Sequence, residues 1–410
     1  MTARGIATAL LLAALFTPIA EAQVRIDGLA GAGSALVDGI DAAPINPARL
    51  AVRGGPRMRL IDSFGATSNN SFDLSDYNRY NGATLTEADE QEILAKIDGD
   101  HLEADGIVRA IGPAFRFGRW AAVIRTHGDA DLGLPKDGLR LLLEGNTPDE
   151  TFHVADFRGT GTFASALSIS HGRWVDVPRA GRWAVGGTIH WIQGWARARV
   201  LEGSGTITTE RAGINGEGSF LLRTATGGSG FGLDLACWRP IAERWSIALV
   251  LHDLFSAVHW TRGTELRHVR FRLQESTAEE ISEGEDLLET EEETTPTGSF
   301  RSTLPPRLNV GVAHERGRWT MAADWTQGFE HSLTTTTTPR VAIGAERRFP
   351  FGITTRAGVS IGGLDRRSAA LGLGFSPGPV RIDLALTARD GSLPFTGNGI
   401  GAGIALGAAF

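Results

Sequence analysis

The side chains that could do chemistry are scattered through this sequence rather than grouped in a recognisable motif. It has no His-Glu-x-x-His zinc pair, no phosphate-binding loop ending in Lys, no strand-to-helix nucleophile elbow and no Cys-x-x-Cys. The ten histidines occur singly, and His190, His252 and His314 fall in segments that alternate like strands. No serine is singled out by its neighbours as a nucleophile. The sequence therefore predicts no catalytic, metal or cofactor site, and no enzyme.

Two further features of the sequence, its single cysteine and an acidic stretch, also argue against a catalytic or metal site. Cys237 is the only cysteine, and it shares a strand phase with Phe231 and Leu235, as a small buried hydrophobe would. Acidic residues crowd residues 275–297, but they lack the regular spacing of a calcium loop, so we predict a long solvated external loop. The net charge of −7 argues against a nucleic-acid partner, which requires a basic surface.

The first 22 residues resemble an export signal. Arg4 supplies a positive charge, residues 7–16 form an apolar run too short to span a bilayer, and Ala20-Glu21-Ala22 is a small-x-small cleavage site. The alternative is an N-terminal membrane anchor, which the short run and the cleavage site disfavour. We predict a signal peptide over residues 1–22 and a mature chain that starts near Gln23.

The rest of the chain alternates with a period of two, which is the pattern of strands with two different faces. Residues 351–362, 380–387, 319–325 and 245–251 each place apolar side chains on one face and Gly, small polar or isolated charged residues on the other. A soluble sandwich would alternate too, but here the apolar faces carry no charge. A cation at a bilayer midplane costs roughly 2–4 kcal/mol. We therefore predict an all-β fold, an antiparallel transmembrane β-barrel of about 14 strands.

Two helices interrupt the strands, one from Thr86 to Ile97 and one from Pro135 to Leu143. Thr86 followed by Asp89 is a helix-capping pair.

Five Arg-Trp pairs recur at predicted strand turns. Gly-Arg-Trp occurs four times and Glu-Arg-Trp once, and Gly permits the tight turn that precedes each Trp. Indole rings prefer the boundary between membrane and water. The alternative is ordinary hairpin chemistry in an Arg-rich chain, but the recurrence favours an interfacial aromatic girdle formed by Trp120, Trp174, Trp183, Trp245 and Trp319.

The chain ends in a strand that runs from about Gly399 to Phe410. Ile404, Leu406 and Phe410 share its apolar face, and the other face is Gly and Ala. An aromatic last residue with apolar residues at every second position before it resembles the signal that barrel-assembly machinery recognises on outer-membrane proteins. We therefore expect the loss of Phe410 to lower assembly, which surface levels of the truncated protein would reveal.

The segment after the signal peptide carries a family resemblance. Residues 31–48 form a Gly/Ala-rich stretch that leads into Asn46-Pro47-Ala48, and this resembles the start of FadL-like outer-membrane transporters. The hairpins around 237–245 and 304–319 look like late hairpins of that family, and residues 77–82 resemble a poorly characterised branch. The resemblance implies that the N-terminal segment folds inside the barrel as a hatch, with Pro47 and Asn46 shaping a compact turn.

The sequence thus predicts three parts: the signal peptide, a hatch over residues 23–55 and a barrel over residues 56–410 in the bacterial outer membrane. The resemblance implies passive transport of hydrophobic small molecules such as fatty acids. The alternative is a non-transporting barrel scaffold that docks the partners of a secretion or envelope system. The expected partners are outer-membrane lipid, the barrel-assembly machinery and a hydrophobic ligand. The residue pattern does not say which ligand is carried.

Overall fold

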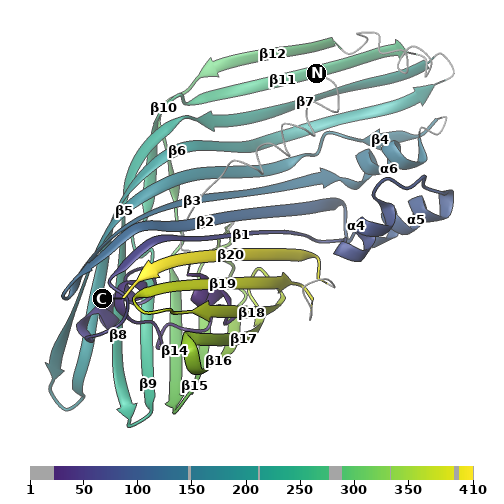
Figure 1. Ribbon diagram of the computed structural model, residues 1–410. Coiled ribbons are helices and arrows are strands. Elements are labelled where there is room, and N and C mark those ends of the chain that lie inside the picture. The colour runs from purple at the N-terminus through teal and green to yellow at the C-terminus, as the bar shows by residue number, and fades with distance from the viewer. Residues whose placement is uncertain are drawn as a thin grey trace.

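The computed structural model shows one antiparallel β-barrel with the N-terminal segment folded inside it (Figure 1). It describes residues 23–145, 149–210, 213–276, 289–332, 334–391 and 397–409. The predicted signal peptide and Phe410 lie outside the described residues. The strands, in chain order, are β1 (Met58–Asn69), β2 (His101–Phe117), β3 (Trp120–Pro135), β4 (Thr151–His153), β5 (Arg158–Val177), β6 (Gly181–Glu210), β7 (Gly213–Ala225), β8 (Gly227–Ala242), β9 (Trp245–His252), β10 (Ala257–Arg262), β11 (Glu265–Ser276), β12 (Glu289–Pro296), β13 (Phe300–Thr303), β14 (Arg307–Arg316), β15 (Trp319–Gly328), β16 (Arg340–Arg348), β17 (Ile353–Gly362), β18 (Arg367–Phe375), β19 (Val380–Arg389) and β20 (Gly399–Ala408).

These segments form 14 barrel strands, because three long strands are interrupted and β4 is a short addition beside β6. β7 and β8 form one strand, which pairs with β6 on one side and with β9, β10 and β11 on the other. β9, β10 and β11 form a second composite strand. β12, β13 and β14 form a third, which pairs with the second. β20 pairs with both β19 and β1, which closes the ring. The prediction of an antiparallel barrel of about 14 strands is confirmed.

The two mouths of the barrel differ. At one end, which we call the short-turn end, strands are joined by tight turns, such as Gly118-Arg119 between β2 and β3. At the other, the long-loop end, the chain forms α4 (Leu74–Tyr80), α5 (Glu87–Lys96) and α6 (Lys136–Glu144), which project together in Figure 1. Outer-membrane barrels have short periplasmic turns and longer external loops. The short-turn end is therefore periplasmic.

The helix predicted from Thr86 is confirmed as α5, with Thr86 and Asp89 forming the expected capping box. The helix predicted from Pro135 is confirmed as α6, with Pro135 at its N-cap. α4 was not predicted, although Asp73 and Asp76 form a capping box at its start. The Asp-x-x-Asp pattern before α4 predicts a helix start less strongly than the pattern before α5, which is Thr-x-x-Asp with an acidic first turn.

The acidic stretch only partly fits the predicted solvated loop. Residues 277–288 lie outside the described part of the chain, but residues 289–296 form β12 rather than loop. Arg267 and Arg270 on β11 lie 3.6 Å and 3.8 Å from Glu292 and Glu291 of β12. Cross-strand charge pairs of this kind favour strand pairing, and they could not be foreseen while the register was unknown.

Large apolar side chains cover the outside of the wall. An exposed apolar surface of this extent is not found on monomeric soluble proteins, but it matches the lipid-facing belt of a membrane barrel. No helix in the described residues is long and apolar enough to cross a bilayer. The outward residues include Phe115, Phe117, Ile124, Leu167, Ile169, Ile189, Phe231, Leu235, Leu249, Met321, Ile343, Val359, Ile361, Leu371, Leu373, Leu384 and Ile404.

The hatch lies inside the short-turn half of the barrel. It consists of α2 (Val24–Asp27), η1 (Gly39–Asp41), α3 (Ala42–Ile45) and η2 (Pro47–Ala51), drawn in purple in Figure 1; a last short helix, η3 (Pro350–Gly352), lies in a turn of the wall. Nearly all hatch side chains are buried, and they share one apolar core with inward residues of the wall. The hatch is thus part of the folded core.

The glycines that alternate along the inner face of the wall make room for the hatch. A Cβ atom at Gly186 of β6 would overlap backbone atoms of Pro47 and Ala48, and one at Gly358 of β17 would overlap Leu29. Backbone can approach this closely only where no side chain intervenes. The glycine face therefore lines the hatch in this half of the barrel.

Replacing Gly186 by Ala should loosen the hatch without unfolding the wall. The added methyl meets backbone, which cannot rotate away, so we expect a cost of about 1–3 kcal/mol, borne by hatch packing. Limited proteolysis of the hatch would measure it. Gly106→Ala is the matched control, since a Cβ at Gly106 of β2 meets no atom within 4 Å. Equal protease resistance in the two variants would show that the glycine face does not hold the hatch.

Candidate functional site

The predicted hatch motif sits at the centre of the hatch. Asn46 is fully buried and caps η2: its Oδ1 accepts a hydrogen bond from Ala48 N at 3.1 Å, and its Nδ2 donates to Ser34 O at 2.8 Å. Pro47 is the first residue of η2, where its fixed φ suits a helix start. Asn46 thus ties two turns of the hatch together through one side chain.

Asn46→Ala should weaken the hatch by about 1–3 kcal/mol, because it removes the cap and leaves buried Ser34 O without its donor. We expect a modest rise in the ionic conductance of the barrel in a planar bilayer, and faster exchange of hatch amides. Asn46→Asp keeps the cap acceptor but places a carboxylate oxygen against Ser34 O in a buried site, so it should loosen the hatch at least as much as Asn46→Ala. If the Asn46→Ala barrel conducts no more than the wild type, the motif is not holding the hatch shut.

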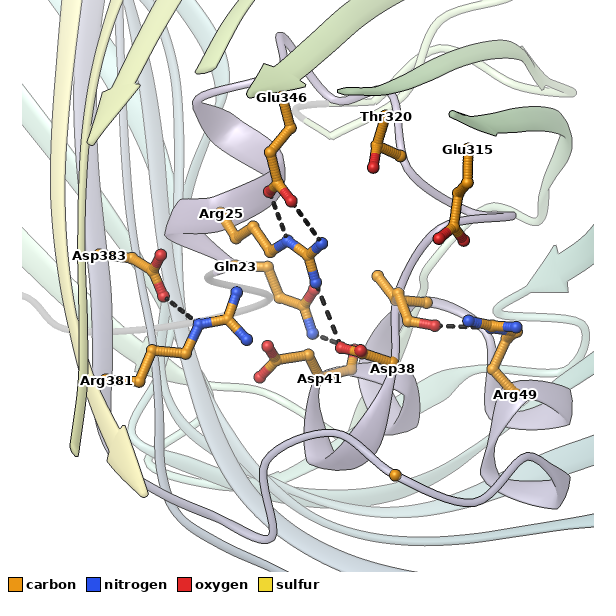
Figure 2. A network of polar contacts seen from close by, with 12 residues as sticks. Gln23, Arg25, Asp38, Asp41, Arg49, Glu315, Thr320, Glu346, Arg381 and Asp383 are labelled. Carbon is orange, nitrogen blue, oxygen red and sulfur yellow. Dashed lines mark hydrogen bonds and ion pairs between the residues drawn. The ribbon is translucent and has the colours of Figure 1, made fainter. Parts of the chain in front are cut away.

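Arg25 connects the hatch to the wall through ion pairs. Its guanidinium lies between two carboxylates (Figure 2): Glu346 of β16, whose oxygens accept from Nε at 3.0 Å and Nη2 at 3.2 Å, and Asp38 of the hatch, at 3.2 Å from Nη1. Burial alone would lower the pKa of Arg25, but Glu346 and Asp38 raise it above its usual value, so Arg25 stays charged. Glu346 also accepts from Arg356 Nε at 2.8 Å.

A second set of contacts extends this network around the wall. Asp383 of β19 lies 2.8 Å from Arg356 and accepts from Arg381 at 3.1 Å, as Figure 2 shows for Arg381. Arg59 of β1 contacts Asp41 of the hatch at 2.5 Å. The inward charges of the strands were visible in the sequence, but their hatch partners were not. We call the buried ion-pair network that joins Arg25 and Asp41 to the wall the latch.

Hydrogen bonds to hatch backbone supplement the latch. Asp324 of β15 accepts from Gly33 N and Ser34 N, both at 3.0 Å. Trp238 Nε1 donates to Ala35 O at 3.1 Å. Burying a backbone group without a hydrogen-bond partner costs free energy. These hydrogen bonds therefore favour one position of the hatch along the barrel axis.

A cavity of about 1350 Å³ lies above the hatch, toward the long-loop end. Hatch residues form its floor, among them Asp27, whose carboxylate lies 3.5 Å from Arg109. Burial raises the pKa of Asp27 to about 6, and Arg109 and Arg340 offset only part of that effect. The charge of the cavity floor therefore changes in mildly acidic solution.

One side of the cavity is apolar. Ile192 and Val258 pack with Trp260 and Ala225, and further apolar side chains pack against this cluster. The residues of this apolar patch that line the cavity are Ala164, Ala166, Ile192, Val258, Phe300 and Leu304. The rest of the lining mixes polar residues, several of them Arg, with further apolar side chains such as Phe64, Ile107 and Phe157. Such a mixed cavity, with an apolar surface and a few polar groups, is typical of small-molecule sites.

A buried polar cluster that the sequence did not reveal lies in the wall above the hatch. Ser168 Oγ is 2.8 Å from His190 Nδ1, and His190 Nε2 is 2.9 Å from Asp234 Oδ2. Arg125 Nε donates to the same Ser168 oxygen at 3.0 Å. Ser168 is buried and is not among the described residues that line the cavity, although Arg125 is. The cluster joins strands β3, β5, β6 and β8.

Comparisons with known proteins agree with this architecture. The model of a family of unknown function, DUF5723, matches residues 60–388. The chain belongs to this family. No curated protein matches the sequence.

Solved structures identify the fold. The toluene transporter TbuX of Ralstonia pickettii is 15% identical, covers 96% of this chain and 98% of its own, and has a TM-score of 0.53. A FadL homologue of Pseudomonas aeruginosa is 12% identical, with 96% and 99% coverage and a TM-score of 0.54. The chain therefore has the FadL-like fold, and its closed wall with an apolar belt makes it a bacterial outer-membrane barrel.

Four of the five predicted girdle tryptophans lie at the short-turn end and face outward. Trp120, Trp245 and Trp319 are 54%, 45% and 44% exposed. Trp183 lies beneath the guanidinium of Arg239. Their role at the interface remains a proposal, supported by this placement.

Trp174 is placed differently from the other four. It lies inside β5 rather than at a turn, and it has the inward phase of Ala184, its cross-strand partner. Its Nε1 donates to Ala51 O of the hatch at 3.1 Å, and its ring packs edge-on against Trp238. The Trp of this Gly-Arg-Trp triplet therefore contacts the hatch. The reason is that the turn after β5 lies five residues beyond Trp174, at Arg179-Ala180.

The predicted assembly residues that the structure describes lie in β20. Ile404 is exposed on the outer face, and Leu406 follows in the same phase. Gly403 is in the opposite phase, and a Cβ atom there would overlap Val24 of the hatch. Recognition of Ile404, Leu406 and Phe410 by assembly machinery remains a prediction.

Proposed function

We propose that this barrel allows the passive passage of hydrophobic small molecules across the outer membrane. The observation that carries the proposal is the cavity of about 1350 Å³, with its apolar patch, directly above a latched hatch. A barrel that served only as a scaffold would not require a cavity of that size. TbuX, which has the same fold and is a toluene transporter, supports the same class of cargo. Fatty acids belong to this class as a narrower expectation.

The hatch gives the proposed passage a closed resting state. It fills the periplasmic half of the lumen with a packed core, so cargo that enters the cavity from the long-loop end meets a floor. Passage through the lumen therefore requires the hatch to shift. The latch and the hydrogen bonds that supplement it hold the hatch together with its apolar core, and such polar contacts can exchange partners as the hatch moves.

The test is the uptake of N-phenyl-1-naphthylamine, a neutral fluorescent probe that intact lipopolysaccharide excludes, by cells that express the barrel. We expect uptake several-fold faster than in cells without it. Ala166→Trp, which fills the apolar patch, should return uptake to background at equal surface levels. Equal uptake with and without the barrel would contradict transport and favour the scaffold alternative.

A further inference from the structure

Three arginines gather on the wall of the cavity beside the apolar patch. Arg199 of β6 and Arg223 of β7 are direct cross-strand partners, and Arg197 lies two residues before Arg199 on the same face. All three line the cavity. Arg197 pairs across the strands with Ala225, which belongs to the apolar cluster. The arginines thus border the apolar patch.

The register shows how charge is distributed around these arginines. On β5 their neighbours are uncharged: Thr162 opposite Arg197, and Thr160 opposite Arg199. Arg197 Nη1 donates to Thr162 Oγ1 at 2.8 Å. The nearest acids on this side, Asp129 and Asp131, lie one strand further away, on β3.

Within the described parts of the chain, neither Arg199 nor Arg223 forms an ion pair. Two like charges directly opposite each other on paired strands are destabilising. An anion placed between them would relieve that repulsion and would accept charge-assisted hydrogen bonds, which are the strong kind. The paired arginines therefore offer two positive charges to an anion in the cavity.

Within the apolar patch beside these arginines, Phe300 presents one flat aromatic ring to the cavity. Phe300 stacks on Trp260 with ring centroids 6.3 Å apart and an interplanar angle of 21°. Trp260 is fixed by a hydrogen bond from its Nε1 to Ser302 Oγ at 2.9 Å. The Arg223 guanidinium lies 5.4 Å from the Phe300 ring centroid. A planar surface of this kind favours offset stacking with another ring.

We propose that this site binds a planar aromatic anion, a ring that carries a carboxylate or sulfonate. The ring lies on the Phe300 face, and the acid group lies between Arg199 and Arg223. Asp129 and Asp131 repel the acid group from the β3 side and so orient the ligand. The inference rests on the proposed function, because it names a class of cargo for the same cavity.

The experiment is isothermal titration of sodium 2-naphthoate into the purified protein in lipid nanodiscs, with empty nanodiscs as the blank. We expect one site per barrel, and binding at least tenfold tighter than that of the neutral analogue 2-naphthalenemethanol or of the aliphatic decanoate. Arg199→Ala and Arg223→Ala should each weaken naphthoate binding roughly ten- to hundredfold, the usual value of hydrogen bonds to charged groups. Arg179→Gly, in a short-turn hairpin where φ is +64°, removes one guanidinium away from the cavity and should change nothing.

Each contrary outcome overturns a stated part of the proposal. Equal affinity for the neutral alcohol would rule out the arginines as an anion site. Equal or tighter binding of decanoate would rule out an aromatic specificity. Unchanged affinity in both Arg variants would place the ligand elsewhere. Uptake of neutral N-phenyl-1-naphthylamine is measured in parallel: if it persists while naphthoate fails to bind, transport stands and only this inference falls.

Discussion

Deleting residues 24–52 from behind the export signal is expected to convert the closed barrel into an open pore. Every wall strand hydrogen-bonds to two neighbours without help from the hatch, so the ring should still close. The hatch supplies half of the buried residues in the apolar core that fills the periplasmic half of the lumen. A barrel of this width without filling leaves a water-filled channel. We expect single-channel conductance in a planar bilayer to rise by about an order of magnitude.

Heat-modifiable migration on gels serves as the control for this deletion, since it reports barrel closure independently of conductance. A folded deletion variant whose conductance equals that of the wild type would show that the segment does not close the lumen. A variant that fails to close would instead show that the hatch is needed for folding. In that case Asn46→Ala and Gly186→Ala, which keep the whole chain, become the tests of closure.

Glu346→Gln is expected to have the largest effect of any single substitution on hatch docking. Glu346 is buried and holds two buried cations, Arg25 at 3.0 Å and Arg356 at 2.8 Å. Removing one partner of a buried ion pair costs about 3–5 kcal/mol, because the other charge is left without compensation. Arg356 retains Asp383 at 2.8 Å, whereas Arg25 keeps only the partly exposed Asp38, at 3.2 Å within the hatch itself, so the ion pair that joins hatch to wall is what is lost. Proteolysis of the hatch and conductance should both increase.

Two variants sharpen the Glu346 experiment. Glu315→Gln removes a carboxylate from the neighbouring wall, where the side chain is more than half exposed and 3.9 Å from Arg348, so little change is expected. Arg25→Met combined with Glu346→Met removes both charges of the hatch contact and should loosen the hatch less than Glu346→Gln does. A double variant at least as loose as Glu346→Gln would mean that packing, not the ion pair, dominates docking.

The barrel could be predicted from the sequence because its signals are local. Alternation along a strand, tight turns and the Thr86–Asp89 cap each depend on residues a few positions apart. The strand count followed from them. The hatch was expected from a resemblance around Asn46-Pro47-Ala48, and the structure shows those residues buried inside the wall.

The latch could not be predicted, because its partners are far apart in the chain. Arg25 and Glu346 are 321 positions apart, and their contact depends on the height at which the hatch sits. Trp174 shows the same limit on a smaller scale: its triplet is identical to three others, and only the position of the turn after β5 sets its face.

The arginine site was missed for a different reason, namely a β-bulge. In β6, even-numbered residues such as His190 and Ile192 face inward, but the register shifts between Gly194 and Ala196. Beyond this shift the odd-numbered Arg197 and Arg199 face the cavity. A bulge inverts the inside and outside assignments of every later residue in the strand, and the sequence carries no mark of it.

The most direct test of lumen transport gated by the hatch is a reversible lock between hatch and wall. Arg25 of the hatch lies against Glu346 of β16, with 3.0 Å between Nε and the carboxylate, so Arg25→Cys with Glu346→Cys, in a Cys237→Ser background, can be bridged by a short bifunctional methanethiosulfonate that holds the hatch in place. We predict that cells with the cross-linked barrel take up N-phenyl-1-naphthylamine at the background rate, and that mild reduction of the cross-link restores several-fold faster uptake. Uptake that is equally fast before and after reduction, with the cross-link confirmed, would contradict passage through a hatch-gated lumen.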